Sequence, residues 1–163
     1  MDRPIFGIMA STEEGVIGLN NSLPWNYPNE LEYYKRMTKD QNIIMGKTSY
    51  EAMPKELLNN SSHAIVLSDE NLVLNDAQVV YSLEECLNYI KKLSIERSVF
   101  MIGGAQTAHS FLERNLLSAF FLTKIHKSYF GDTYLDLSYF ETWSKFVMMT
   151  CKEYTIYYLK NPN

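Results

Sequence analysis

One carboxylate near the start of the chain, Glu30, stands where an acid could anchor a ligand. It follows a loop rich in glycine and asparagine, residues 15–22, and a segment in which Pro24 and Pro28 flank Trp25. Glycine lets a loop approach a ligand closely, and loops on a rigid scaffold often carry function. The combination indicates a lid over a pocket that holds one acid. The alternative is a surface loop, a core tryptophan and a helix-start acid that faces water, which the helix dipole also favours.

Two glycine turns follow apolar runs and precede helical patterns. One is Gly-Lys-Thr-Ser at residues 46–49, and the other contains Gly103 and Gly104. Backbone N–H groups at such turns can cradle a phosphate. Neither turn is a Walker motif or a complete Gly-x-Gly-x-x-Gly fingerprint. An N-cap by Thr48 is the alternative for the first turn, and a turn that needs glycine only for its geometry is the alternative for the second.

Apolar runs alternate with helical patterns along the first two thirds of the chain. Short apolar runs predict strands at 5–10, 41–45, 63–68, 79–80, 98–102 and 119–126. One helix is predicted to start at Pro28 and to bury Leu31, Tyr34 and Met37, and a capping box starts another at Ser82. The elements that must position the candidate residues are therefore strands joined by helices.

The last third of the chain is richer in β-strand signals. Residues 143–150 and 153–159 predict a hairpin, whereas residues 57–62 predict a polar connector. The order of the elements favours one α/β domain over residues 1–163, with a mixed, mainly parallel sheet and an antiparallel C-terminal edge.

Composition narrows the class of protein. The chain has 163 residues, of which 46% are hydrophobic and 21% charged, with a net charge of −4. An acidic balance disfavours nucleic acid as partner, and no apolar run is long enough for a membrane span. The sequence shows no targeting segment, and Cys86 and Cys151 lack metal spacing, so a cytoplasmic protein with reduced cysteines is expected. The three histidines show no ligand spacing either, and no metal is expected.

Together these motifs resemble the dihydrofolate reductase family over essentially the whole chain. The residues that carry the resemblance are Val16-Ile17-Gly18, Leu23-Pro24-Trp25, Glu30 before Leu31, Ile44-Met45-Gly46-Lys47-Thr48, Ile102-Gly103-Gly104, Thr123 and Gly131-Asp132-Thr133. The resemblance implies an eight-stranded mixed sheet with about four helices. It also implies a monomer that reduces the small molecule dihydrofolate with NADPH, for one-carbon metabolism.

The resemblance implies catalytic roles for Glu30, Trp25 and Leu23. Glu30 would accept two N–H bonds from the pteridine ring and favour its protonation, Thr123 would orient Glu30, and Trp25 would hold a water. The substrate-binding residues would be Ile8, Met9, Ala10, Glu30, Leu31, Tyr34, Ser49, Met53, Leu57, Ile102 and Thr123.

The cofactor site implied by the resemblance runs along both glycine turns, with a cis peptide between the paired glycines. Its residues would be Ala10, Ile17, Gly18, Asn21, Ser22, Gly46, Lys47, Thr48, Ser49, Leu67, Ser68, Ile102, Gly103, Gly104, Ala105, Gln106 and Thr107. The loop 13–23 would close over the nicotinamide, and the loop at Gly131 and Asp132 would support the closed form.

The chain departs from the family pattern in four places. The arginine that usually clamps the folate glutamate aligns with Ser62, and a usual aromatic residue is Ala108. Asp69 and Glu70 follow Ser68 where a basic or hydroxyl residue usually recognises the cofactor's 2′-phosphate, so NADH is the alternative to NADPH. The fourth departure, Ala105 in the glycine turn, is mild.

Two other functions stay open at this point. A reductase of another pterin, or of a riboflavin-pathway pyrimidine, would explain the missing arginine. A non-catalytic pterin- or nucleotide-binding module would keep the fold without turnover. The retention of Glu30, Trp25 and Thr123 favours the enzyme.

Overall fold

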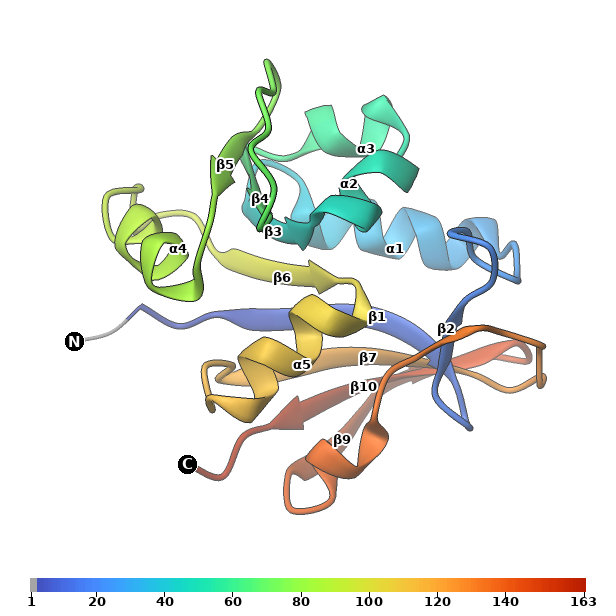
Figure 1. Cartoon of the computed structure of the whole chain (residues 1–163). Helices are drawn as coiled ribbons and strands as arrows, with labels where there is room; N and C mark the ends of the chain where they lie inside the picture. Colours follow the sequence, from blue (N-terminus) through green and yellow to red (C-terminus); the bar gives the residue numbers. More distant parts are fainter. Residues whose placement is uncertain (1–2) are drawn as a thin grey trace.

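A single eight-stranded sheet organises the chain (Figure 1), and the computed structural model describes residues 3–163 of it. Residues 1 and 2, which the sequence places before the first strand, lie outside the described part. The strands are β1 (Phe6–Thr12), β2 (Val16–Gly18), β3 (Asn42–Gly46), β4 (His63–Leu67), β5 (Gln78–Val80), β6 (Val99–Gly103), β7 (Ala119–Ile125), β8 (Thr133–Tyr134), β9 (Ser144–Thr150) and β10 (Tyr154–Lys160). The helices are α1 (Pro28–Thr38), α2 (Lys47–Ala52), α3 (Lys55–Asn60), α4 (Leu83–Ile90), α5 (Ala105–Glu113) and the 3₁₀ turn η1 (Leu137–Phe140).

The strand order in the main sheet is β5-β4-β3-β6-β1-β7-β10-β9. Neighbouring strands are parallel from β5 to β7, whereas β10 pairs antiparallel with both β7 and β9. This arrangement confirms the predicted mixed, mainly parallel sheet with an antiparallel C-terminal edge.

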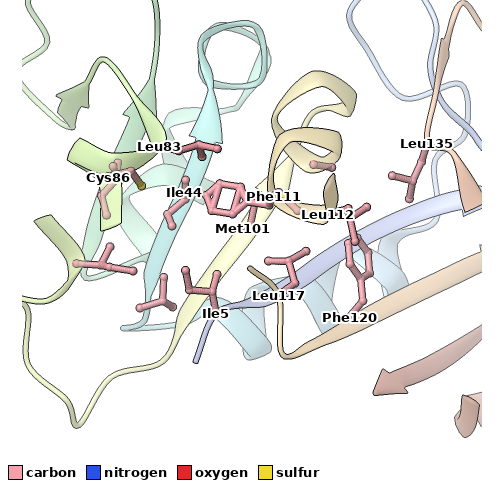
Figure 2. Packing of buried hydrophobic residues seen from close by; sticks show 14 of the residues in the cluster. Ile5, Ile44, Leu83, Cys86, Met101, Phe111, Leu112, Leu117, Phe120 and Leu135 are labelled. Carbon is pink, nitrogen blue, oxygen red and sulfur yellow. The ribbon is translucent and has the colours of Figure 1, made fainter. Parts of the chain in front are cut away.

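Helices cover both faces of the parallel half of the sheet, and each face has its own apolar core. In one core, Phe111 of α5 and Cys86 of α4 gather with Ile44 of β3 and Met101 of β6 (Figure 2). The other core contains Ile43 of β3 and side chains of α1 and α3. Since successive strand residues point to opposite faces, a strand that is covered twice is apolar throughout, which explains the short unbroken runs in the sequence.

Local signals set several element ends as predicted. Helix α1 starts at Pro28, and the Ser82 hydroxyl caps α4 by accepting a hydrogen bond from the Glu85 N–H at 3.0 Å. The Tyr81 N–H in turn donates a hydrogen bond to the Glu85 carboxylate at 2.6 Å. The alternative interpretation, an N-cap by Thr48, is wrong, because α2 starts at Lys47 and its N-cap is Gly46.

Three further predictions need correction. Residues 57–62 are not a connector, because α3 covers most of that segment, and so five α-helices form in the described residues instead of about four. The glycine-rich loop and the loop near residue 133 contribute β2 and β8, which pair as a small second sheet. Leu31 is 37% exposed, and the side chains that α1 buries include Tyr33, which the expected face omitted.

Among the described residues, none of the helices has the length and the apolar character that crossing a bilayer requires. The sheet, its two cores and the helix ends form the scaffold on which the candidate residues lie.

Arg3 joins the N-terminal segment to the end of α4. Its guanidinium donates to the carbonyls of Ile90 at 3.1 Å and Leu93 at 2.8 Å, and also to those of Ser94 and Arg97. Ile90 is the last residue of α4, and the other three carbonyls belong to the segment that follows it. A cation beside the end of a helix complements the partial negative charge there.

We expect Arg3→Ala to lower the free energy of unfolding by about 1–2 kcal/mol, because four carbonyls lose a charged donor at a partly exposed site. Urea unfolding followed by circular dichroism measures the change. Arg114→Ala is the matched control, since no hydrogen bond of its side chain is found within residues 3–163, and it should change stability by less than about 0.5 kcal/mol. Equal effects of the two substitutions would contradict the role given to Arg3.

Candidate active site

The carboxyl ends of four parallel strands, β1, β6, β3 and β4, lie along one edge of the sheet. Strand pairing places Gly46 beside Leu67, and Met45 beside Gly103. The direction of the connections reverses here, since the chain passes from β3 to β4 on one side of the sheet and from β6 to β7 on the other. Ligands of open α/β sheets bind outside the carboxyl ends of the strands at such a point. The candidate site therefore lies at this edge.

Glu30 lies on the side of α1 that packs toward the sheet. Positions 30, 33, 34, 37 and 38 form a stripe at helical spacing, and Tyr33 and Thr38 in that stripe are buried. Burial raises the pKa of Glu30, and a hydrogen bond with the side chain of Thr123 on β7 acts in the opposite direction. Thr123 itself is only 1% exposed. Glu30 is thus not the water-facing acid that the alternative interpretation describes.

Two tyrosines of the same stripe, Tyr33 and Tyr34, lie close enough to the Glu30 carboxyl for its charge to affect their pKa values. Burial, and then the negative charge of Glu30, raise the pKa of Tyr33 to about 12. Burial is also the main reason why the pKa of Tyr34 is raised. Neither phenol oxygen has a hydrogen-bond partner within residues 3–163. The described residues place no cation that shifts the pKa of Glu30, so a bound ligand that donates N–H bonds would stabilise its charged form.

Trp25 is buried, at 6% exposed, and its Nε1 has no hydrogen-bond partner among the described residues. Its ring lies 5.7 Å from that of Tyr129, and the Tyr129 hydroxyl forms a 2.7 Å hydrogen bond with that of Tyr27. The segment around Trp25 is therefore fixed against the chain that follows β7. A buried N–H without a protein partner is the atom that a ligand or an ordered water would satisfy.

The two glycine turns meet at the centre of this edge. A Cβ atom on Gly46 would lie 2.6 Å from the hydroxyl oxygen of Thr107 on α5, so a side chain there would force Thr107 to move. Gly103 has φ +116°, a conformation that favours glycine, and the predicted cis peptide joins it to Gly104. Helix α5 begins at Ala105 without a side-chain cap. Close packing is enough to explain why these positions are glycine, even without a ligand. The backbone amides at the start of α5 have no side-chain partner that caps them.

Two loops meet beside the site through backbone and carboxylate contacts. The Asn20 N–H donates to Asp132 Oδ2 at 3.0 Å, and the Asp132 N–H donates to the Gly18 carbonyl at 3.0 Å. The Asn20 N–H, followed by the Thr133 hydroxyl, lowers the pKa of the Asp132 carboxyl. The loop that carries β2 is thus held by the loop before β8 in this conformation.

The remaining residues predicted to form the site differ in their exposure to solvent. Those that are buried are Ile8, Gly18, Ser68, Gly103, Thr107 and Thr123. Those that are half-buried are Met9, Ala10, Ile17, Lys47, Ser49, Met53, Leu57, Leu67, Ile102, Gly104 and Ala105. Asn21, Ser22, Leu23, Leu31, Thr48 and Gln106 are exposed.

Some of these residues are brought together and others are not. Asn21 and Thr48 line one hollow with Glu51 and Ala52. Leu23, expected to be catalytic, is 55% exposed. The site residues predicted from the sequence omit Tyr33, although its three-residue distance from Glu30 indicates a shared helix face. No local signal indicates Tyr129, which reaches Trp25 only in the folded chain.

We expect Glu30→Gln to raise the Tm of the ligand-free protein at pH 7 by about 2–4 °C. Because burial raises the pKa of Glu30 in the folded chain, folding favours the protonated acid. The stability that the protonated Glu30 provides is complete at low pH and is lost as pH rises through its folded pKa. Glutamine stays neutral at every pH, so the gain in Tm from Glu30→Gln should vanish near pH 4. Thermal unfolding at both pH values measures this. Glu32→Gln, whose side chain is 60% exposed, is the control and should show no such dependence.

We expect Asp132→Ala to speed hydrogen exchange of the Asn20 amide about 5-fold at pH 7, because that N–H loses its acceptor. Since the pKa of Asp132 is lowered, the carboxylate acceptor persists as pH falls until the folded pKa is reached. Asp69→Ala removes an exposed acid elsewhere and serves as the control. An unchanged exchange rate at Asn20 would contradict the contact between the two loops.

Comparison with known proteins places this chain in a family. The family model described as dihydrofolate reductase matches residues 4–157. A dihydrofolate reductase of Lactococcus lactis subsp. lactis (strain IL1403) is 31% identical over 137 residues, which are 83% of this chain and 79% of the relative. The dihydrofolate reductase of Bacillus subtilis (strain 168) is 33% identical over 125 residues, which are 77% of this chain and 71% of the relative.

A solved structure agrees with these relatives. The dihydrofolate reductase from Enterococcus faecalis, complexed with NADP(H) and RAB-propyl, superposes with a TM-score of 0.79 at 27% identity, covering 98% of this chain and 97% of its own. The family model spans nearly the whole chain, and the two glycine turns end β3 and β6, which are neighbours in the eight-stranded sheet. This chain belongs to the dihydrofolate reductase family.

Proposed function

We propose that this chain is an NADPH-dependent dihydrofolate reductase that converts 7,8-dihydrofolate into tetrahydrofolate. The observation that carries the proposal is the position of Glu30, a carboxyl with a raised pKa on the sheet-facing side of α1, at the edge where the glycine turns meet. Membership of the family and the NADP(H) complex of the Enterococcus faecalis relative support the same reaction.

Glu30 binds the pterin part of the substrate in this proposal. Its two oxygens can accept hydrogen bonds from two adjacent N–H groups of a planar ring, a bidentate match that fixes the ring's orientation. Thr123 keeps the carboxyl in place, and Trp25 Nε1 donates to a water or ligand atom beside the ring. The apolar side chains that would line the pocket are Ile8, Tyr34, Met53, Leu57 and Ile102.

The same carboxyl favours the proton that the reduced ring nitrogen must gain. A partly buried acid without a neighbouring cation stabilises positive charge that develops on the ring, and solvent delivers the proton. Bringing the ring and the nicotinamide to reacting distance contributes much of the remaining rate.

The residues at the sheet edge fit a dinucleotide. NADPH, when bound, supplies the hydride. The amides at the start of α5 lack a side-chain cap and suit the pyrophosphate, next to Gly103 and Gly104. Gly46 packs directly on Thr107, which brings the two glycine turns into one surface. The loop that carries β2 closes over the nicotinamide while Asp132 holds it.

The initial rate of NADPH oxidation with dihydrofolate tests the proposal, with NADH measured in parallel. Turnover that depends on dihydrofolate is expected. A folded sample that oxidises neither cofactor with dihydrofolate would overturn it, and activity with a tail-free dihydropterin or a pyrimidine would then identify the other reductase reaction. Tight cofactor binding without any turnover would indicate a binding module.

We expect Glu30→Gln to lower kcat/KM for dihydrofolate about 100-fold or more at pH 7, because the ring loses a charge-assisted anchor and the stabilisation of its proton. The loss should shrink at acid pH, where the substrate is already protonated. Steady-state rates from pH 5 to 8 measure both effects. Glu32→Gln on the outer side of α1 should stay within about twofold of the parent, and an unchanged rate for Glu30→Gln would remove its role.

A further inference from the structure

We propose that Glu70 is a specificity-determining residue of the cofactor site. By pairing with Lys47, Glu70 weakens the preference for a cofactor whose adenosine carries a 2′-phosphate over a cofactor whose adenosine carries a 2′-hydroxyl. The inference rests on the proposed function, since it concerns the adenosine end of the same cofactor site.

The sheet order places the adenosine end of the cofactor. The nicotinamide must lie near Glu30 and Thr123, on the side of β1 and β7, to reach the pterin ring. The glycine pair that suits the pyrophosphate ends β6, the next strand after β1. The dinucleotide must therefore continue past β6 to the carboxyl ends of β3 and β4, which lie about 5 and 10 Å farther along the edge.

Charged groups occupy that end of the edge. Lys47 directly follows β3, and its Nζ lies 2.7 Å from Glu70 Oε2, just after β4, and 3.5 Å from Glu51 Oε1 on α2. The Lys47 side chain is 36% exposed and both glutamate side chains are 59% exposed, so the cation is the most enclosed of the three.

The chain positions Glu70 on Lys47. The Glu70 N–H donates to the Ser68 hydroxyl at 3.0 Å, and that hydroxyl donates to the Glu70 carbonyl at 3.3 Å. Ser68 is buried, at 7% exposed. This turn fixes the backbone of Glu70 at the end of β4, and the hydrogen bond to Glu70 is the largest cause of the raised pKa of Lys47.

The chemistry of the two possible adenosines differs at this pair. A 2′-phosphate must compete with Glu70 for Lys47 and is repelled by the carboxylate that it displaces. A 2′-hydroxyl can donate to the carboxylate, as an acidic residue does for NAD in other dinucleotide sites. Lys47 paired with Glu70 therefore gives less preference for the phosphorylated adenosine than Lys47 alone would give.

Isothermal titration calorimetry with two cofactor fragments tests the inference without catalysis. Adenosine 2′,5′-bisphosphate carries the phosphate, and adenosine 5′-monophosphate lacks it. For Glu70→Gln we expect the Kd of the bisphosphate to fall about 5- to 10-fold at low salt, and that of the monophosphate to change by less than about twofold. The gain should shrink at 0.5 M salt, because these groups are solvent-exposed.

Glu51→Gln is the matched control, because it removes the same charge at the same exposure but at the longer distance from Lys47. We expect it to strengthen bisphosphate binding by no more than about twofold. Lys47→Gln should weaken bisphosphate binding, and in that background Glu70→Gln should strengthen binding less than it does in the parent, because only the direct repulsion of the phosphate is then relieved.

Equal effects of Glu70→Gln and Glu51→Gln, or no effect of either, would overturn the inference. Failure of the proposed function would look different, since the parent protein would then show no dihydrofolate-dependent oxidation of NADPH or NADH. Thermal unfolding of each variant confirms that the fold is intact before titration.

Discussion

The arrangement of the site depends on one carboxyl group held partly away from water. Glu30 faces the sheet because it shares a helical stripe with Tyr33 and Thr38, and Thr123 is the group that the chain provides to oppose the cost of its burial. An acid on the buried side of a helix disfavours its own charged form. In the proposed function, a ligand with matching N–H groups would supply the missing partners, and Glu30 would bind that ligand at some cost to the stability of the fold.

The mainly parallel sheet determines where everything else lies. Parallel strands bring their carboxyl ends to one edge, so the turns after β3 and β6 are neighbours although 57 positions separate Gly46 from Gly103. Close packing at these turns requires glycine for steric reasons, and the same lack of side chains exposes the backbone amides at the start of α5. Structural need and ligand binding thus favour the same residues here.

Charge balance differs between the two ends of this edge. Near Glu30 the described residues supply no cation that shifts its pKa, whereas Lys47 at the other end has two glutamates beside it. An acid without a paired cation favours ligands that donate hydrogen bonds. A cation that is already paired with carboxylates has no strong preference for a negatively charged ligand. In the proposed function, the two ends would therefore contribute unequally to selectivity.

The sequence by itself determined the features that depend on neighbouring residues. Unbroken apolar runs indicated strands covered on both faces, Pro28 indicated the start of α1, and Ser82 indicated the cap of α4, because each of these signals acts within a few residues. The order of motifs was enough to indicate the family. Tertiary structure alone decided that α3 forms in a polar segment, that β2 pairs with β8, and that Tyr129 covers Trp25. It also decided that Lys47 pairs with Glu70, since contacts between distant residues depend on how the strands are ordered and not on local propensity.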